Sequence, residues 1–349
     1  MTGSARPPRA RRAPSMADVA ALAGVSHQTV SRVLNDHPMV KQETRDRVQA
    51  SIEQLGYRRN NAARALVTNR SGLIGLVGAH LGLHGPGMIA GAVQEAAHDA
   101  GYSVAQVGLP DLSADALRST VDRLLDQAVE AVVVAVAQRQ ALDVVASLDL
   151  PVPVVLVQGV RPGQSMAAGV DQTAGGLLAT RHLLDLREAG GVSGGAPGGV
   201  AHVTGPLDWI EAVMRREGWL QAHQERGVVP GREVVGDWSS SSGYAAGLEL
   251  AADPQVEAVF AGNDAMALGV LRALHETGRR VPSDVAVVGF DDAPDSACYW
   301  PPLTTVRQDF AALGRRAVAL ALQALDGERD ATLDLVAPEL VVRTSSVPG

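Results

Sequence analysis

The polar side chains between residues 26 and 35 could read the bases of a DNA duplex. A helix is predicted from a cap at Ser26 to about Asn35, and it places His27, Gln28 and Arg32 on its outer face. Such a helix fits the major groove, where glutamine pairs with adenine and arginine with the O6/N7 edge of guanine. Three hydroxyl groups of the segment could reach phosphates: those of Ser26, Thr29 and Ser31. The alternative is the ordinary polar face of a small helical bundle.

Two further short helices flank this segment. Ser15 and Asp18 have the spacing of a helix start, and Gly24 suits the left-handed residue that ends such a helix. A third helix is predicted from about Lys41 to Leu55, with Gly56 as its end. The first helix carries an apolar stripe of Val19, Leu22 and Ala23. Three short helices with a tight turn between the first two predict a helix-turn-helix unit.

The charge distribution separates the N-terminal part from the rest. Lys and Arg outnumber Asp and Glu by 12 to 5 in residues 1–70, although the whole chain has 30 against 38 and a net charge of −8. A basic head on an acidic body favours binding of a polyanion at one end. The alternative is a solvated, arginine-rich tail.

Composition excludes several other classes of protein. Cys298 is the one cysteine, so neither a disulfide framework nor a cysteine-rich metal site is expected. No run approaches the roughly 18 apolar residues of a membrane helix, and Met1–Ser15 lacks the apolar stretch of an export signal. We therefore expect a cytoplasmic protein with no membrane partner.

From residue 73 the pattern alternates between strands and helices, which predicts parallel sheets covered by helices. The candidate strands are Leu73–Gly78, Ser103–Gly108, Ala131–Val136, Pro153–Gln158, Val200–Thr204, Ala258–Ala261 and Val285–Phe290. The candidate helices include Gly87–Ala100, Ala114–Ala128, Thr173–Leu186, Trp209–Arg226 and Asp264–Thr277. So many strands favour two α/β lobes over one sheet, with a ligand cleft at the C-terminal ends of the strands. Residues 190–199 have the composition of a flexible surface loop.

No enzyme signature accompanies this pattern. The sequence contains no Gly-rich phosphate loop, no His-x-x-x-His spacing and no nucleophile elbow. Asp291 and Asp292 could suggest a catalytic carboxylate pair, but adjacent residues at the end of a strand point apart. No catalytic residue, metal site or cofactor is expected.

Residues 18–35 resemble the N-terminal signature of the LacI/GalR family of bacterial transcription regulators. The resemblance continues in order through most of residues 16–345. The segments that carry it are Thr44-Arg45, Leu55–Tyr57, Asn60–Leu66, Leu83–Pro86, Gly205–Leu207, Arg215, Gly218-Trp219, Gly236–Trp238, Asn263–Gly269, Val288–Asp292 and Cys298–Thr305. It implies a helix-turn-helix domain followed by a two-lobed α/β core like that of periplasmic binding proteins.

The resemblance also implies domain boundaries. They are a tail at 1–14, a helix-turn-helix domain at 15–58, a hinge at 59–70 and an effector-binding and dimerisation core at 71–349. Within the core, the N-lobe would comprise about 71–170 and 308–337, and the C-lobe about 171–307 and 338–345.

The hinge segment gains a role from the resemblance. It would become helical only when two subunits sit side by side on an operator, with Leu66 wedged into the minor groove. Asn35, Asn60 and Ala63 would also contact DNA. Arg59 stands where the family usually has proline, so the lead-in to the hinge is less rigid here; Lys41 replaces a common capping serine.

In the core, the resemblance implies contacts to a small sugar. Those expected from matching positions are Arg215, Trp238, Asn263, Asp291 and Phe310, with Leu83 and Pro86 as walls. At four other pocket positions this chain has a different residue type from that of a similar member of the family. These positions are Ala79, Ala135, Gln158 and Glu211. A galactoside is therefore one candidate and a different sugar another. The alternative for Arg215 and Asp291 is a structural ion pair, and for Trp238 a place in the core.

His84 and Asp295 match dimer-interface positions, although two unrelated surface residues would look the same. No leucine heptads follow residue 337, so a dimer is expected. Together these features predict a DNA-binding transcription regulator, most readily a repressor, controlled by a sugar. Two alternatives are a sugar-binding transport protein with no DNA role and, with little support, a sugar-processing enzyme.

Overall fold

The structure, a computed structural model, describes residues 14–57, 70–161, 163–189, 199–332 and 335–347. The chain separates into two compact units, Met1–Ser71 and Gly72–Gly349. Most of the expected tail, hinge and 190–199 loop lies outside the described residues, and so do Arg59, Asn60, Ala63 and Leu66.

The first unit contains the three predicted helices, α1 (Met16–Ala23), α2 (His27–Leu34) and α3 (Gln42–Leu55). The helix start at Ser15 is confirmed, because its hydroxyl accepts a hydrogen bond from the Asp18 N–H (3.3 Å) and its own N–H donates to Asp18 Oδ2 (2.7 Å). Gly24 and Gly56 end α1 and α3 with φ of 64° and 61°, a conformation in which a Cβ atom is unfavourable.

A small apolar core holds these helices together. Val19, Val30 and Val48, one from each helix, are fully buried. The prediction for Leu22 was wrong, since its side chain is 45% exposed. The buried arc of α1 is formed by Val19, Ala20 and Ala23, and Leu22 lies beside that arc.

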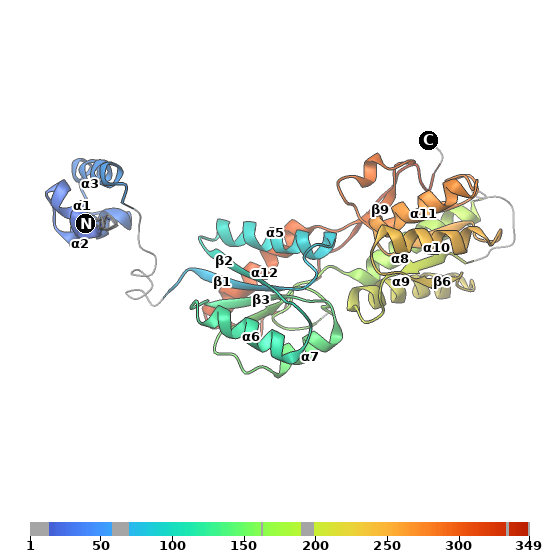
Figure 1. The fold of residues 1–349 in the computed structure, drawn as a ribbon, viewed down its shortest axis with the longest axis horizontal. Coiled ribbons are helices and arrows are strands. Elements are labelled where there is room, and N and C mark those ends of the chain that lie inside the picture. The colour runs from blue at the N-terminus through green and yellow to red at the C-terminus, as the bar shows by residue number, and fades with distance from the viewer. Residues whose placement is uncertain (1–13, 58–69, 162, 190–198, 333–334, 348–349) are drawn as a thin grey trace, which may run out of the picture. The chain divides into compact units, whose positions relative to one another are not determined.

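The second unit begins with a parallel sheet in the order β2-β1-β3-β4. Its strands are β1 (Leu73–Gly78), β2 (Ser103–Gly108), β3 (Ala131–Ala135) and β4 (Val154–Leu156). One face is covered by α5 (His84–Asp99) and α12 (Phe310–Leu325), the other by α6 (Ala114–Leu125) and α7 (Arg139–Ser147) (Figure 1). Val133 packs on the α5 side and Val132 on the α6 side, because successive residues of a strand point to opposite faces. We call this part the N-lobe.

The second sheet has the order β10-β9-β8-β7-β5-β6 and forms what we call the C-lobe. Its strands are β5 (Ala201–Thr204), β6 (Glu233–Val235), β7 (Ala258–Ala261), β8 (Ala286–Asp291), β9 (Thr304–Arg307) and β10 (Glu339–Val341). Only β10 is antiparallel to its neighbour. The covering helices are α8 (Gln172–Glu188) and α9 (Ile210–Arg226) on one face, α10 (Ser240–Ala251) and α11 (Asp264–Glu276) on the other. A short 3₁₀ helix, η1, spans Ser296–Cys298.

The chain passes between the lobes after β4, after β9 and after α12. The seven predicted strands are present, whereas β6, β9, β10, α7, α10 and α12 were not among the predicted elements. None of the helices that the structure describes is both long and apolar enough to span a bilayer.

Candidate functional site

The outer face of α2 is open to solvent. His27, Gln28 and Arg32 are exposed, while Val30 and Val33 of the same helix are buried in the three-helix core. Within the described part of the chain, none of these three polar side chains is engaged in a hydrogen bond or an ion pair. Their donors and acceptors are therefore free for another molecule.

The other residues of this segment that are predicted to contact DNA also form hydrogen bonds at the two ends of α2. Ser26 Oγ accepts a hydrogen bond from the Thr29 N–H (3.1 Å), and Asn35 Nδ2 donates to the Ser31 carbonyl (2.9 Å). Ser26 and Asn35 are exposed, and Thr29 and Ser31 are half-buried. An eight-residue helix is not stable by itself, so these bonds help to fix the direction of its outer side chains.

A cleft between the two lobes lies at the C-terminal ends of the strands. All nine residues predicted to contact an effector line it: Leu83, Pro86, Gln158, Glu211, Arg215, Trp238, Asn263, Asp291 and Phe310. Ala79 and Ala135 do not line the cleft, which corrects the expectation for them. Both are buried in the apolar core of the N-lobe.

Arg215 is the centre of a closed ring of polar contacts. Its Nε donates to Gln172 Oε1 (2.8 Å), and Gln172 Nε2 donates to Gln308 Oε1 (2.8 Å). Gln308 Nε2 in turn donates to Asp291 Oδ1 (2.7 Å), which lies 3.6 Å from Arg215 Nη2. Arg215 Nη1 also donates to the Gly262 carbonyl. This ring joins α8, α9, the end of β8 and the crossover before α12.

The ring is deeply buried, and burial changes its acid–base chemistry. Arg215 and Asp291 are each 7% exposed at the side chain. Loss of hydration raises the pKa of Asp291, and the Arg215 guanidinium opposes this rise. The guanidinium carbon also lies 3.7 Å from the centroid of Phe290, which gives the cation an aromatic face.

Glu211 is a second buried carboxylate of the cleft. Its Oε1 accepts a hydrogen bond from the Gly159 N–H (2.9 Å), whereas Oε2 has no hydrogen-bond partner within the described residues. Burial raises the pKa of Glu211. An unpaired buried acceptor is unfavourable until a donor reaches it.

Aromatic rings form the apolar part of the cleft. Trp238 has a φ of 72°, which is rare for a bulky residue, and Asn263 Nδ2 donates to its carbonyl (3.0 Å). Asn263 Oδ1 meanwhile caps α11 by accepting from the Met266 N–H (2.8 Å). Trp238 Nε1 is buried without a partner among the described residues. A strained indole held by a second residue is the kind of feature that clusters at ligand sites.

Sequence reasoning missed several residues of the cleft. Gln172 and Gln308 close the polar ring, and Trp209, Met214 and Leu313 add apolar walls. The one available signal was their position at element boundaries, since Gln172 begins α8 and Gln308 precedes α12.

The two residues predicted at a dimer interface, His84 and Asp295, have different surroundings. His84 begins α5, is half-buried and lines the cleft, where its ring meets Phe310 at 6.0 Å between centroids. Asp295 is exposed and accepts a hydrogen bond from the Tyr299 hydroxyl (3.5 Å). Their expected place at a dimer interface stays a prediction.

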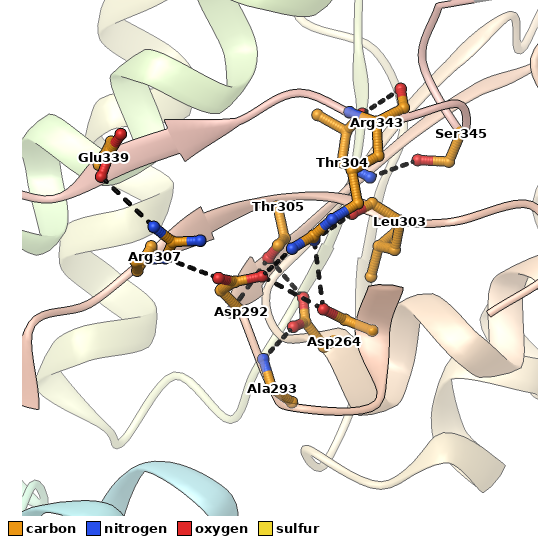
Figure 2. A network of polar contacts seen from close by, with 11 residues as sticks. Asp264, Asp292, Ala293, Leu303, Thr304, Thr305, Arg307, Glu339, Arg343 and Ser345 are labelled. Atoms are coloured by element: carbon orange, nitrogen blue, oxygen red, sulfur yellow. Dashed lines mark hydrogen bonds and ion pairs between the residues drawn. The ribbon is translucent and has the colours of Figure 1, made fainter. Parts of the chain in front are cut away.

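Asp292 turns away from the cleft, as expected for a neighbour of Asp291. Figure 2 shows its carboxylate between Arg307, at the end of β9, and Arg343, beyond β10. Asp292 Oδ2 accepts from Arg307 Nε and Oδ1 from Arg343 Nη2, both at 2.7 Å. Asp264 lies beside them and accepts from Thr305 Oγ1 (2.6 Å). The ends of β8, β9 and β10 are thus tied where the chain crosses between the lobes.

The cleft suits a compound with several hydroxyl groups. Amide, guanidinium and carboxylate groups stand in fixed positions beside aromatic rings, which is how proteins fix the orientation of small ligands. Among the described residues, no group of three His, Cys, Asp or Glu side chains could hold a metal ion.

Two family profiles match the chain, one in each of its two compact units. The profile of bacterial regulatory proteins, lacI family, matches residues 15–60. The profile of the periplasmic binding protein-like domain matches residues 201–346.

Curated relatives match almost the whole chain. The lactose operon repressor of Escherichia coli is 34% identical over 95% of this chain and 90% of its own length. The HTH-type transcriptional regulator CelR of Thermobifida fusca is also 34% identical, over 96% and 99%.

Solved structures agree with these relatives. The lac repressor dimer bound to operator and the anti-inducer ONPF has a TM-score of 0.83 at 33% identity, covering 96% of this chain and all of that one. The CelR–cellobiose complex has a TM-score of 0.67 at 31% identity, covering 95% and 100%.

Proposed function

Because the chain belongs to the lacI family of bacterial regulatory proteins, we propose that it is a DNA-binding transcription repressor whose operator affinity is set by a small sugar. The relatives are regulators rather than enzymes. The observation that carries the proposal is the presence in one chain of two separate surfaces that offer polar groups to other molecules. They are the exposed face of α2 and the polar ring beside aromatic walls in the cleft.

Each part of the chain has a role in this proposal. His27, Gln28 and Arg32 read bases, while Ser26, Thr29, Ser31 and Asn35 contact the backbone or position the helix. Two chains act as a dimer, because half-sites of an operator are read by paired helices. In that dimer Asn60, Ala63 and Leu66 contact the minor groove, and His84 and Asp295 lie at the interface.

The sugar acts through a difference in affinity. A ligand that binds one arrangement of the lobes more tightly shifts the protein toward that arrangement. Arg215, Asn263 and Asp291 would contact sugar hydroxyls, while Trp238 and Phe310 would cover the apolar face of the ring. We propose a galactoside as the first compound to test and release of DNA as its effect.

Fluorescence anisotropy with labelled DNA fragments from beside the gene tests both halves. Salt-dependent binding to one fragment, lost on addition of one sugar from a panel, is the expected result. Arg32→Ala should reduce preference for that fragment without changing sugar binding, and Arg215→Met should abolish the response to sugar without changing that preference. A chain that prefers no fragment, with or without sugar, contradicts the proposal.

A further inference from the structure

Two buried side chains of the cleft have polar groups without partners in the part of the chain that the structure describes. Gln158 and Glu211 are each only 7% exposed, and both line the cleft. Glu211 Oε2 accepts no hydrogen bond there, and the Gln158 amide forms none. Of the four positions where this chain differs in residue type from a similar family member, these are the two that line the cleft. The groups that await a ligand are therefore those peculiar to this chain.

The two side chains come from different lobes and lie close to each other. Gln158 follows β4 of the N-lobe, and Glu211 lies in the first turn of α9 in the C-lobe. The N–H of Gly159, the residue next to Gln158, donates to Glu211 Oε1 (2.9 Å). That bond occupies one oxygen of the carboxylate and leaves Oε2. A carboxylate only accepts hydrogen bonds, and the amide oxygen of glutamine also accepts, so this corner of the cleft suits a ligand group rich in donors.

The charges of the cleft do not balance when both of its carboxylates are ionised. The titratable side chains that line it are His84 of α5, Glu211 and Arg215 of α9, and Asp291 of β8. Arg215 acts on both carboxylates, but all three of its nitrogen atoms are engaged in the polar ring around Asp291. Within the described residues Glu211 has no ion pair of its own. A buried carboxylate without a counter-ion is unfavourable, and a cation that enters the cleft removes this cost.

The same corner also needs an acceptor, which narrows the class of ligand. A primary ammonium group has three donors and no acceptor, so it suits Glu211 Oε2 and the amide oxygen of Gln158. Trp238 Nε1 also belongs to the cleft wall and is a buried donor without a partner among the described residues. Hydroxyl oxygens can accept from it, whereas a simple diamine cannot. The apolar face of a sugar ring can in addition pack on the indole.

We propose that the effector is an amino sugar whose ammonium group binds between Glu211 and Gln158. The inference rests on the proposed function and names the class of sugar that the cleft takes. A neutral sugar can place one hydroxyl donor on Glu211, but it leaves the charge of the carboxylate unbalanced. Hydrogen bonds between two charged groups are also stronger than those between neutral ones.

Calorimetric titration of the full chain at about pH 6.5, where an amine of ordinary basicity is protonated, tests the proposal. The amino sugars are D-galactosamine and D-glucosamine. Each is compared with its parent, D-galactose or D-glucose, and with its N-acetyl derivative, which lacks the charge. One amino sugar should bind at least about 10-fold more tightly than both of its neutral counterparts. This comparison uses the unaltered chain, so it does not depend on the folding of a variant.

Two variants locate the ammonium group. Glu211→Gln keeps the size of the side chain and an oxygen that can accept from the Gly159 N–H, but it removes the charge. It should reduce the preference for the amino sugar over its parent to about 2-fold or less. Glu217→Gln is the matched control in the same helix, because Glu217 is 45% exposed at the side chain and pairs with Arg161 at 3.4 Å on the surface. It should retain the full preference.

The outcomes separate this inference from the proposed function. If the parent sugars bind as tightly as the amino sugars, or if Glu211→Gln keeps the preference, the assignment of an ammonium group to this corner is wrong. If no amino sugar binds while another sugar changes operator binding in the anisotropy assay, the inference fails and sugar control of the protein stands. If no sugar of either kind changes operator binding, both are overturned.

Discussion

Replacing Arg215 by methionine tests whether the buried ring is held by charge. Methionine keeps much of the length of the side chain but removes the cation that faces Asp291, Gln172 and the Gly262 carbonyl. The Asp291 carboxylate, 7% exposed, then remains in the protein interior without its counter-ion. Removing one partner of a buried pair typically lowers the free energy of unfolding by about 3–5 kcal/mol. For the unit Gly72–Gly349, with an unfolding entropy of about 2.1 cal/mol/K per residue, that corresponds to a fall in melting temperature of roughly 5–9 °C.

The loss should depend on pH in a defined direction. Without Arg215, the pKa of Asp291 in the folded protein rises further above its value in the unfolded chain, which is about 3.9. A carboxyl with a raised folded pKa binds a proton more tightly when folded, so it lowers stability as the pH rises above the unfolded value. The deficit of Arg215→Met should therefore be smallest near pH 4 and grow toward pH 8. Arg215→Met combined with Asp291→Asn should recover much of the loss at pH 8.

Thermal unfolding without sugar, between pH 4 and 8, measures these effects. Arg216→Met is the matched control, because Arg216 lies next in α9 and pairs with Glu233 at 2.6 Å while 39% exposed at the side chain. A partly exposed pair contributes less than about 1 kcal/mol. Equal losses for the two variants, or a deficit at Arg215 that does not change with pH, would refute the reasoning.

Three further changes address other parts of the molecule. Arg32→Ala should reduce preference for the operator over random DNA by roughly 5- to 150-fold, the value of one good base contact of about 1–3 kcal/mol, as measured by competition binding; an unchanged preference removes Arg32 from base reading. Gly205→Ala should weaken sugar binding and lower stability by about 1–3 kcal/mol, because its Cβ would overlap the Trp238 ring; calorimetry that finds normal affinity contradicts this. His202 is fully buried, and burial lowers its pKa to about 4. Between about pH 6.5 and pH 4 the unfolded chain therefore binds a proton at this histidine and the folded chain does not. The free energy of unfolding should fall by about 3 kcal/mol over that range as the pH is lowered. His202→Phe should flatten this part of the stability curve, and an unaltered slope in chemical unfolding would assign the acid sensitivity elsewhere.

The sequence predicts those features that depend on neighbouring residues. The start of α1 at Ser15 and the glycine ends of α1 and α3 follow from local hydrogen bonds and backbone preference. The apolar strands β1, β3 and β8 follow from composition alone, because strands buried on both faces need continuous runs of apolar residues.

Elements stabilised by tertiary contacts were harder to predict. Helix α10 is rich in serine and glycine, which are poor helix formers in its interior. Its glycines are instead required by packing, since a Cβ on Gly243 would overlap the backbone of Met266 in α11. Strands β6 and β10 have three residues each, too few for a periodic signal.

The candidate site, too, could be predicted only in part. Resemblance to a family placed nine residues around one cleft, but not the contacts among them. Gln172 and Gln308 are 136 residues apart, and only the crossover after β9 brings their amides together. The prediction that Ala79 lines the cleft failed because the sequence pattern is ambiguous there. A small apolar residue at a strand end can either be buried in a core or face a cleft, and Ala79 is buried.

Asp291 and Asp292 connect the cleft to the crossovers between the lobes. Both have positive φ, 113° and 53°, so the backbone of this pair is held in a sparsely populated conformation. Asp291 completes the ring with Gln308, which itself lies on the crossover to α12. Asp292 binds Arg307, at the end of β9 where this crossover begins, and Arg343, beyond β10. A sugar that takes over a hydrogen bond of Asp291 or Gln308 must change contacts at the crossover itself. A ligand in the cleft can thereby favour one arrangement of the lobes.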